Sequence, residues 1–334
     1  MSYGRLDQCW RSFLEKIVKT FMKRTVWSEE GMMDTFPIVV SFNKKYLLPA
    51  LVTIKSIIDN CSDVSRIEFF VLYRELDQTV IQIAERTVAA FGSLISFVDC
   101  SSFLENMNFA NDENRPLETY FPLFIPTIFR EYDRVLSIDV DMLVRDDVLK
   151  IINQIPHDKK LGGVRCLIRN HRKYEDFGDF NKYSRNMLGI NNPYLYVNSG
   201  LILFNMEAIT EDDASYCVEC IKKKWRFYDE AILNHVFKDS LHHFAQGWNF
   251  YAEHLKTSCL EFDYSMQEEV KEAQENASIY HFVADTKPWD HPQPRTRNKY
   301  RLEYRALVAE VKEEVRNQLP KIVCGFMWNK IDRA

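Results

Sequence analysis

The sequence lacks the signals of several protein classes. It contains no run of the roughly 18 consecutive apolar residues that a membrane-spanning helix needs. Residues 1–30 carry charges throughout and have no uninterrupted apolar segment, so they do not resemble a secretory signal peptide. There is no internal repeat and no low-complexity tract. These absences predict a cytoplasmic protein, associated at most with the inner face of the membrane.

The eight cysteines also lack the regular spacing of a disulfide framework, which favours a reducing compartment. They are Cys9, Cys61, Cys100, Cys166, Cys217, Cys220, Cys259 and Cys324. Cys217 and Cys220 form a lone C-x-x-C in a helical stretch, far from a second pair. We therefore expect these two side chains to pack in the core, with a redox or zinc site as the alternative.

Charge is unevenly distributed along the chain. Residues 1–27 carry six basic and two acidic side chains, and residues 295–334 carry ten and five, so these segments have charges of +4 and +5. The whole chain has a net charge of −5, which leaves −14 on the body between them. An acidic body does not predict a nucleic-acid partner.

The first segment has the spacing of an amphipathic helix. Between residues 6 and 22, apolar side chains recur every three or four positions, and lysine and arginine fill the other face. Such a helix either lies on an anionic membrane surface or packs on its own domain, and the pattern leaves both open.

Strand-like and helix-like patterns alternate from Pro37 onward, which predicts an α/β fold with helices on both faces of a mostly parallel sheet. The apolar content of 46% is sufficient for a large core. The expected strands are residues 37–42, 67–73, 94–99, 134–138, 160–164, 196–205 and 279–282. The expected helices are residues 46–58, 77–91, 148–155, 214–225, 229–237 and a charged stretch from residue 300.

The triplet Asp139-Val140-Asp141 directly follows the apolar run from Arg134 to Ile138. Alternate side chains of an extended strand point to one face, so both carboxylates are expected to lie in one cleft. Two like charges this close need a counter-ion, and a hard divalent cation completed by substrate phosphates fits them. Short D-x-D strings also arise by chance, and two solvated acids that close a strand are the alternative.

Three other segments have features of a binding site. Residues 165–193 are polar and aromatic, which favours a lid or binding loop over a solvated surface insertion. Gly200 interrupts a buried strand, a position typical of close approach by a ligand or by backbone. Asp229 and Glu230 open a helix, where acids commonly interact with the helix dipole.

Taken together, five groups of residues from about Pro37 to Trp289 resemble glycosyltransferase family 8. This family of retaining enzymes includes bacterial lipo-oligosaccharide galactosyl- and glucosyltransferases and, more distantly, glycogenin. The groups are the opening strand with Tyr46 and Ser56, Asp139-Val140-Asp141, Asn198-Ser199-Gly200 with Asn205, Asp229-Glu230-Ala231-Ile232-Leu233-Asn234, and His281 with Lys287-Pro288-Trp289.

The resemblance implies a GT-A type nucleotide-sugar-binding domain, with a mixed, mostly parallel sheet flanked by helices and with added N- and C-terminal helices. The expected boundaries are residues 1–35 for an N-terminal amphipathic extension, 36–294 for the GT-A domain and 295–334 for a basic helical tail. It also implies a metal site at Asp139, Asp141 and His281. An imidazole beside two carboxylates fits Mn²⁺ better than Mg²⁺, which is the alternative.

The resemblance further implies the residues that hold the donor. The expected nucleotide-sugar-binding residues are Ser41, Asn43, Tyr46, Ile138, Asp139, Val140, Asn198, Ser199, Asp229, Ala284 and Lys287. The expected catalytic residues are Glu230 and Asp229 near the anomeric carbon, and Lys287 at the β-phosphate, where charge develops as UDP leaves. Glu230 stands where the family often has glutamine. A glutamate is a chemically competent nucleophile, yet front-face attack guided by the departing phosphate is the favoured route.

The implied function is Mn²⁺-dependent transfer of a hexose, glucose or galactose, from a UDP-sugar to a glycan or lipid-linked saccharide. The alternative is a catalytically degenerate sugar-nucleotide or glycan binding protein of the same fold. Three departures from the family pattern support that alternative, at Asn43, Pro122 and Cys166. Self-glycosylation is a weaker option, because the candidate acceptors Tyr300 and Tyr304 fall in an expected helix.

Overall fold

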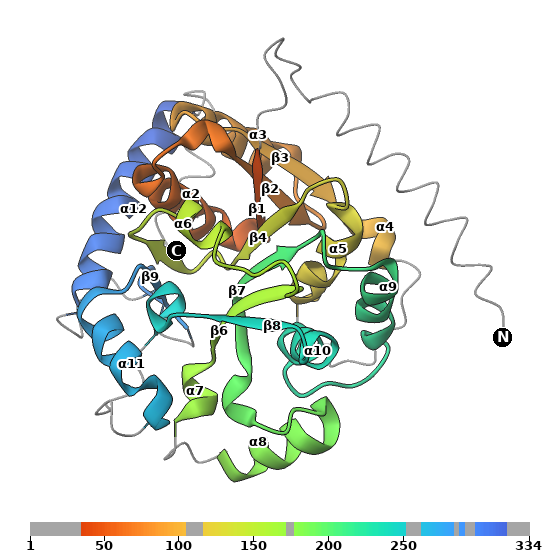
Figure 1. Cartoon of the computed structure of the whole chain (residues 1–334). Helices are drawn as coiled ribbons and strands as arrows, with labels where there is room; N and C mark the ends of the chain where they lie inside the picture. The colour runs from red at the N-terminus through yellow and green to blue at the C-terminus, as the bar shows by residue number, and fades with distance from the viewer. Residues whose placement is uncertain are drawn as a thin grey trace.

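The computed structural model describes residues 35–104, 116–171, 177–251, 262–283, 287–290 and 298–318. Its centre is a seven-stranded sheet with the order β3-β2-β1-β4-β7-β6-β8 (Figure 1). The expected helix at residues 6–22, Ala284 and the apolar run at residues 322–328 lie outside the described residues.

The first half of the sheet is parallel. Its strands are β1 (Phe36–Ser41), β2 (Ile67–Tyr73), β3 (Ile95–Asp99) and β4 (Arg134–Ile138). The connections between them include η1 (Lys44–Tyr46), α2 (Leu47–Asn60), η2 (Val64–Arg66), α3 (Gln78–Ala90), α4 (Ser101–Leu104), η3 (Leu117–Phe124) and α5 (Ile125–Ile128). The strands are rich in buried β-branched and aromatic residues, as strands covered on both faces require.

The second half of the sheet reverses direction at β7 (Val197–Asn205), which is antiparallel to both β4 and β6 (Leu161–Arg165). The edge strand β8 (Leu241–Phe244) runs parallel to β6. The expected mixed, mostly parallel sheet flanked by helices is therefore confirmed. The reversal at β7 matters for the site, because it brings the start of this strand to the edge where β4 ends.

A second, two-stranded sheet joins β5 (Met142–Val144) to β9 (Ile279–His281), with Met142 opposite His281. We did not expect β5, because three residues are too few to show a period in the sequence. This pairing connects the backbone that follows the acidic triplet with a strand almost 140 residues later in the chain.

The remaining helices cover the flanks of the sheet. They are α6 (Leu149–Ile152), α7 (Leu167–Asn170), α8 (Phe177–Tyr183), η4 (Ser184–Leu188), η5 (Pro193–Leu195), α9 (Glu211–Cys220), α10 (Tyr228–Phe237), η6 (Gln246–Asn249), α11 (Tyr264–Asn276) and α12 (Lys299–Gln318). The long helix α12 runs beside α2 along one flank (Figure 1). Among the described residues, no helix has the length and apolar character needed to cross a membrane.

Some expectations about these elements were wrong. The segment of residues 165–193 was expected to be a loop, but its described parts hold α7, α8 and the π-helical turn η4, because Leu167, Phe180 and Leu188 bury their side chains in the core. Helix α9 begins three residues earlier than expected, behind a capping box in which Thr210 and Asp213 exchange hydrogen bonds. We did not expect β8 or α11.

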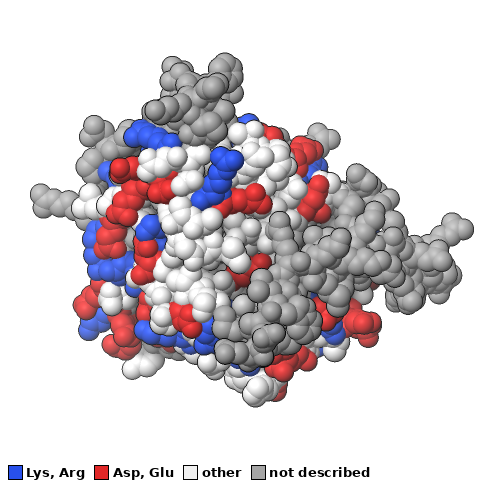
Figure 2. Space-filling model, turned by 90° about the horizontal axis from the view of Figure 1, so that it is seen from above, with Lys and Arg blue, Asp and Glu red and all other residues white. Residues whose placement is uncertain are grey.

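Charged side chains of both signs are interspersed on the described surface that Figure 2 shows, with an uncharged area between them. A mixed surface of this kind gives no broad field of one sign on that face.

Candidate functional site

The candidate site lies where β4 ends and β7 begins. Because β7 is antiparallel to β4, its first residues extend past the last residue of β4 at the same edge of the sheet. The backbone N–H of Asp139 donates to the Gly200 carbonyl (2.9 Å) and joins the two segments there. The acidic triplet and the Asn-Ser-Gly step, 57 positions apart between Asp141 and Asn198, are therefore adjacent in space.

Asp139, Asp141 and His281 form a cluster whose ligand atoms all lie within 4.8 Å of one another. The His281 Nε2 atom lies 3.1 Å from Asp141 Oδ1 and 3.7 Å from Asp139 Oδ2. The imidazole is buried at 4% exposure, whereas 54% of the Asp139 side chain is open to solvent. Two carboxylates and one imidazole nitrogen around a partly open position fit a borderline divalent cation such as Mn²⁺.

The two carboxylates differ in electrostatic environment. Burial favours the neutral form of Asp141, but the charges and hydrogen bonds of His281 and Lys287 outweigh it and hold its pKa below the usual range. Burial of the site and the charge of Asp141 raise the pKa of Asp139. Because Asp139 is more than half exposed, water screens part of this shift. The uncompensated negative charge therefore lies on the solvent side of the cluster, where it is accessible to a cation.

Lys287 lies against Asp141 at the edge of the acidic pair. Its Nζ atom donates to Asp141 Oδ2 (2.6 Å) and to the Phe282 carbonyl (2.6 Å). Only 16% of the side chain is exposed. The ammonium group is thus held next to the acidic pair, in a position from which it could also interact with an anionic ligand of this site.

Asn198, Ser199 and Glu230 form a hydrogen-bonded group beside the cluster of Asp139, Asp141 and His281. Glu230 Oε2 accepts from Asn198 Nδ2 (2.8 Å) and from the Ser199 backbone N–H (3.3 Å). Burial raises the pKa of Glu230, and the nearby Arg169 guanidinium partly offsets this. Glu230 is therefore an acceptor within the site, and not only a partner of the helix dipole as the sequence pattern alone indicated.

Asp229 is the most buried carboxylate of the group, with 8% exposure. Burial raises its pKa well above the usual value, and the charges of Asp139 and Glu230 raise it further. The preceding residue, Tyr228, has a φ of 50°, a conformation that costs a non-glycine residue about 1–3 kcal/mol. This strain accompanies the turn of the first residues of α10 toward the site.

Gly200 gives the backbone close access to the imidazole. A Cβ atom at this position would lie 2.5 Å from His281 Cε1 and 2.9 Å from Asn198 Oδ1. Neither contact is sterically allowed, so the strand could approach His281 this closely only with glycine here. The sequence predicted a close approach at Gly200 by a ligand or by backbone, and the structure shows the Gly200 backbone close to the His281 ring.

The expected nucleotide-binding residues of the first turn lie next to the segment that carries Lys287. Asn43 caps η1, because its Oδ1 accepts from the Lys45 backbone N–H (3.0 Å). The Tyr46 ring meets the edge of Trp289 with 6.1 Å between centroids. Ser41 lies half-buried at the end of β1. The side chains of Ile138 and Val140 are buried, which leaves their backbone for a ligand.

The sequence did not indicate three residues that support the site. Thr53 of α2 places its hydroxyl 2.9 Å from the carbonyls of Val140 and Met142. The Arg169 guanidinium carbon lies 3.9 Å from the centroid of the Phe227 ring, and its charge lowers the pKa of Glu230. Asn249 is fully buried and contacts both His281 and Asn198. A polar residue in apolar surroundings is the signal that could have found Thr53. Arg169 lies in residues 165–193, which the sequence predicted as a lid or binding loop without giving this residue a role, and Asn249 gave no signal.

The cysteines of interest are free thiols. Cys217 and Cys220 are buried in the core on α9, and burial raises the pKa of both. The Cys166 Sγ atom lies 3.1 Å from the Tyr251 hydroxyl, and burial raises its pKa to about 12. A buried neutral thiol at this position cannot act as a charged ligand for a sugar.

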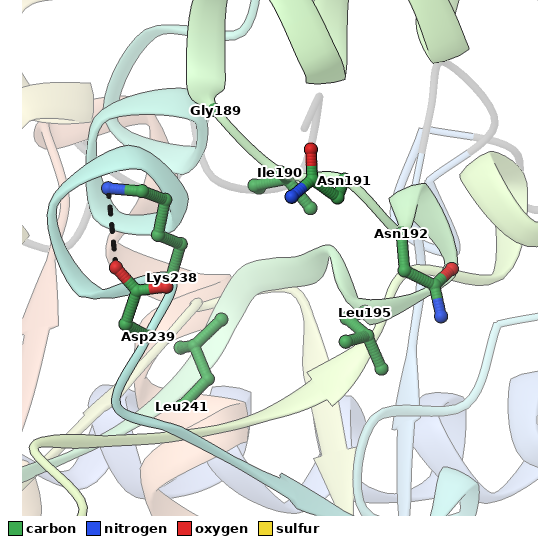
Figure 3. A pocket seen from close by; sticks show the side chains of 8 residues that line it. All are labelled: Gly189, Ile190, Asn191, Asn192, Leu195, Lys238, Asp239 and Leu241. Atoms are coloured by element: carbon green, nitrogen blue, oxygen red, sulfur yellow. Dashed lines mark ion pairs between the residues drawn. The ribbon is translucent and has the colours of Figure 1, made fainter.

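A separate pocket of about 220 Å³ lies between the segment after η4 and the junction of α10 with β8 (Figure 3). Its lining combines amide and apolar side chains with the ion pair of Lys238 and Asp239 (3.7 Å). Gly189 ends η4 in the left-handed conformation (φ 70°) at its rim. None of the expected site residues lines this pocket.

Residues 37–292 match the model of the family "Glycosyl transferase family 8". The chain belongs to this family. General stress protein A of Bacillus subtilis (strain 168) is 23% identical over 231 residues, which span 66% of this chain and 74% of that protein.

Two solved structures of glycosyltransferases share the fold. The bifunctional glycosyltransferase WbbM has a TM-score of 0.73 at 22% identity over 88% of this family 8 chain. The match covers 53% of WbbM, so this chain spans about half of that protein. The galactosyltransferase LgtC, in complex with donor and acceptor sugar analogues, has a TM-score of 0.64 at 21% identity over 85% of this chain and 100% of its own. The architecture is that of the GT-A fold.

Proposed function

We propose that this protein is a retaining glycosyltransferase that moves a hexose, glucose or galactose, from a UDP-sugar to a glycan or lipid-linked saccharide with the help of Mn²⁺. The observation that carries this proposal is the convergence, at one edge of the sheet, of the cluster Asp139–Asp141–His281 with the Asn198–Glu230 pair. The first set suits a cation and its diphosphate, and the second suits hydroxyl groups of a sugar.

Asp139, Asp141 and His281 would hold the metal. A bound Mn²⁺ would supply positive charge to the diphosphate of the donor. Lys287, which lies against Asp141, would direct its ammonium group to the β-phosphate and stabilise the charge that develops there. Tyr46 would line the nucleotide side together with its neighbour Trp289.

The transfer itself exchanges one C–O bond for another. The acceptor oxygen forms a bond to the anomeric carbon while the bond from that carbon to the β-phosphate oxygen breaks. The departing phosphate keeps the electron pair and takes the proton of the acceptor hydroxyl, so that UDP and the glycoside are the products. Asn198 and Asp229 would orient the hydroxyl groups of the donor sugar.

Glu230 has a role in this scheme without forming a covalent bond. Its Oε2 atom already accepts two N–H groups, from Asn198 and Ser199. These hydrogen bonds give the carboxylate the role of holding Asn198 in position, a role that needs only an acceptor oxygen and that a glutamine could also fill. This supports front-face attack over a glycosyl-enzyme intermediate.

The degenerate binding protein is the competing function, and Cys166 is the observation that favours it, because a buried thiol lies where the family pattern has an aspartate. Self-glycosylation at Tyr300 or Tyr304 is disfavoured, because these residues of α12 are 4% and 0% exposed.

A donor screen tests the proposal. The full chain is incubated with Mn²⁺ and a panel of UDP-sugars, and UDP release is measured with and without EDTA. We expect UDP release from UDP-glucose or UDP-galactose, and we expect EDTA or the variant Asp141→Asn to abolish it. The control variant Asp59→Asn, which changes a partly exposed acid of α2, should leave UDP release intact. Binding of a UDP-sugar without metal-dependent release would instead identify a degenerate binding protein.

A further inference from the structure

Asn249 is a buried polar residue to which neither the sequence nor the proposed reaction gives a role. It ends η6, and its side chain has 0% exposure. Two backbone hydrogen bonds hold it opposite β9, since the Phe250 N–H donates to the Ile279 carbonyl (3.0 Å) and the His281 N–H donates to the Phe250 carbonyl (2.9 Å). Its amide therefore lies between the metal ligand and β7.

The orientation of the neighbouring Asn198 amide is fixed by groups that cannot reverse their roles. The Gly200 backbone N–H donates to Asn198 Oδ1 (3.1 Å). Asn198 Nδ2 donates to Glu230 Oε2 (2.8 Å), an oxygen that also receives the Ser199 backbone N–H. A backbone N–H is always a donor, so the oxygen and nitrogen of Asn198 are assigned without ambiguity.

This assignment propagates to Asn249 and then to His281. Asn249 Nδ2 donates to Asn198 Oδ1 (2.8 Å), so Asn249 Oδ1 faces His281 Nδ1 at 2.9 Å. An amide oxygen only accepts, and therefore Nδ1 carries the ring proton. Nε2 is then the nitrogen that a metal would bind, and in the metal-free site it lies 3.1 Å from Asp141 Oδ1, the carboxylate oxygen with which it interacts there.

We propose that Asn249 is a positioning residue of this site. It holds the His281 ring in the Nδ1-protonated form with Nε2 directed at the acidic pair, and it connects this ligand through Asn198 to Glu230. The inference rests on the proposed function for its metal. Partners of this kind fix the tautomer and orientation of a ligating histidine, and their loss typically weakens metal affinity by roughly 10- to 100-fold.

Replacement of the side chain tests this role in the full-length protein. Mn²⁺ affinity is measured from the EPR signal of free Mn²⁺, without donor or acceptor. We expect Asn249→Ala to weaken binding roughly 10- to 100-fold. The matched control is Asn205→Ala, which removes an equally buried amide that donates to the Lys159 carbonyl (2.8 Å) at the opposite end of β7. This control is expected to bind Mn²⁺ as the wild type does.

A second variant separates the contact of Asn249 with His281 from its contact with Asn198. Asn249→Asp retains an oxygen that accepts from His281 Nδ1 but cannot donate to Asn198. We expect it to keep its affinity for Mn²⁺ and to lose affinity for a UDP-sugar relative to UDP alone. Equal losses of metal and sugar binding in this variant would contradict the proposed division of roles.

The ring nitrogens of His281 give a readout that needs no metal. In the metal-free protein, ¹H–¹⁵N correlation spectra should show Nδ1 protonated in the wild type and in Asn205→Ala, with the signal assigned by its loss in His281→Gln. In Asn249→Ala, Nδ1 loses its acceptor, so we expect the Nδ1 proton signal to be lost and a proton to remain only on Nε2, opposite Asp141. An unprotonated Nδ1 in the wild type, or wild-type Mn²⁺ affinity in Asn249→Ala, would overturn the proposal. If the wild type does not bind Mn²⁺, the proposed function fails, and the ring nitrogens still decide the role of Asn249.

Discussion

Asp139 and Asp141 carry the same chemical group but differ in burial and in the charges around them. Asp141 is 15% exposed and has two cationic or hydrogen-bonding neighbours, whereas Asp139 is 54% exposed and has its main interaction with a like charge. The metal-free site is therefore electrostatically unfavourable at Asp139. Because the like charges repel each other in the metal-free site, a bound cation would also relieve this repulsion, which favours cation binding.

Substitution of Asp139 by Asn tests this balance. The folded-state pKa of Asp139 is raised, so its ionised form destabilises the fold above the pKa of the unfolded chain, and the effect disappears as pH falls. In EDTA at neutral pH, we expect Asp139→Asn to raise the free energy of unfolding by up to about 1 kcal/mol, since exposure screens the interaction. The difference should vanish near pH 4 in urea titrations.

Added Mn²⁺ should reverse the order of stability of the wild type and Asp139→Asn. Added metal stabilises the wild type by mass action and leaves Asp139→Asn unchanged. A variant that is less stable than the wild type in EDTA would show that Asp139 is attracted to His281 more strongly than it is repelled by Asp141.

At Glu230, the expected result of a substitution is retention of activity. In Glu230→Gln, the amide oxygen can accept from Asn198 Nδ2 and Ser199 N–H as the carboxylate does. We therefore expect UDP release and transfer to remain measurable. Glu230→Ala, which removes the acceptor altogether, should lose more activity than the Gln variant. Complete loss in Glu230→Gln, together with a trapped glycosyl-enzyme in the wild type, would favour a covalent intermediate.

At the scale of elements, helix α2 fixes the backbone that follows the acidic triplet. Thr53 bonds the carbonyls of Val140 and Met142, and Ser56 Oγ accepts the Val144 N–H (3.0 Å). Both side chains are buried. Two hydroxyl groups on the inner face of one helix thus satisfy a non-helical segment of backbone that has left the main sheet.

Thr53→Val and Thr87→Val form a matched pair that tests this arrangement. Both threonines are fully buried, on α2 and α3, but Thr87 Oγ1 has no hydrogen-bond partner among the described residues. We expect Thr53→Val to lower the free energy of unfolding by about 1–3 kcal/mol, because buried carbonyls lose a donor. Thr87→Val should be neutral or slightly stabilising.

Urea titrations in EDTA measure the stability of both variants, and EPR titrations with Mn²⁺ measure whether the triplet keeps its geometry. Weaker Mn²⁺ binding is expected for Thr53→Val only. Equal stabilities would mean that water replaces the Thr53 hydroxyl.

The sequence predicted the elements whose own periodicity is strong and missed those that neighbours impose. Strands such as β1 and β4 carry enough buried residues to be recognised, and Asp139 and Asp141 follow from the end of β4. The three-residue strand β5 exists because β9 pairs with it, which no local pattern indicates. His281 entered only through the family resemblance, since a lone histidine has no sequence signature of its own. Asn249 could not be found at all without the fold that brings it to His281.

For the whole molecule, the remaining question is where the protein works. The body is acidic and the two ends are basic, with charges of +4 over residues 1–27 and +5 over residues 295–334. A lipid-linked acceptor would be presented at a membrane surface. Basic residues near anionic lipid contribute roughly 1 kcal/mol each. We therefore predict that the protein binds anionic membranes through its ends.

Flotation with lipid vesicles tests this prediction on the full chain. We expect the protein to float with vesicles that contain anionic phospholipid at low salt, and to stay in solution with neutral vesicles or at high salt. Neutralising Lys16, Lys19 and Lys23 to Gln should weaken binding by roughly 3 kcal/mol, which is about a hundredfold. The same change at Lys222, Lys223 and Lys224, an exposed basic run after α9, serves as the control. If both triple variants lose binding equally, overall charge and not the N-terminal segment governs membrane binding. If the wild type does not float with anionic vesicles, the prediction is wrong, and the acceptor must reach the enzyme in solution.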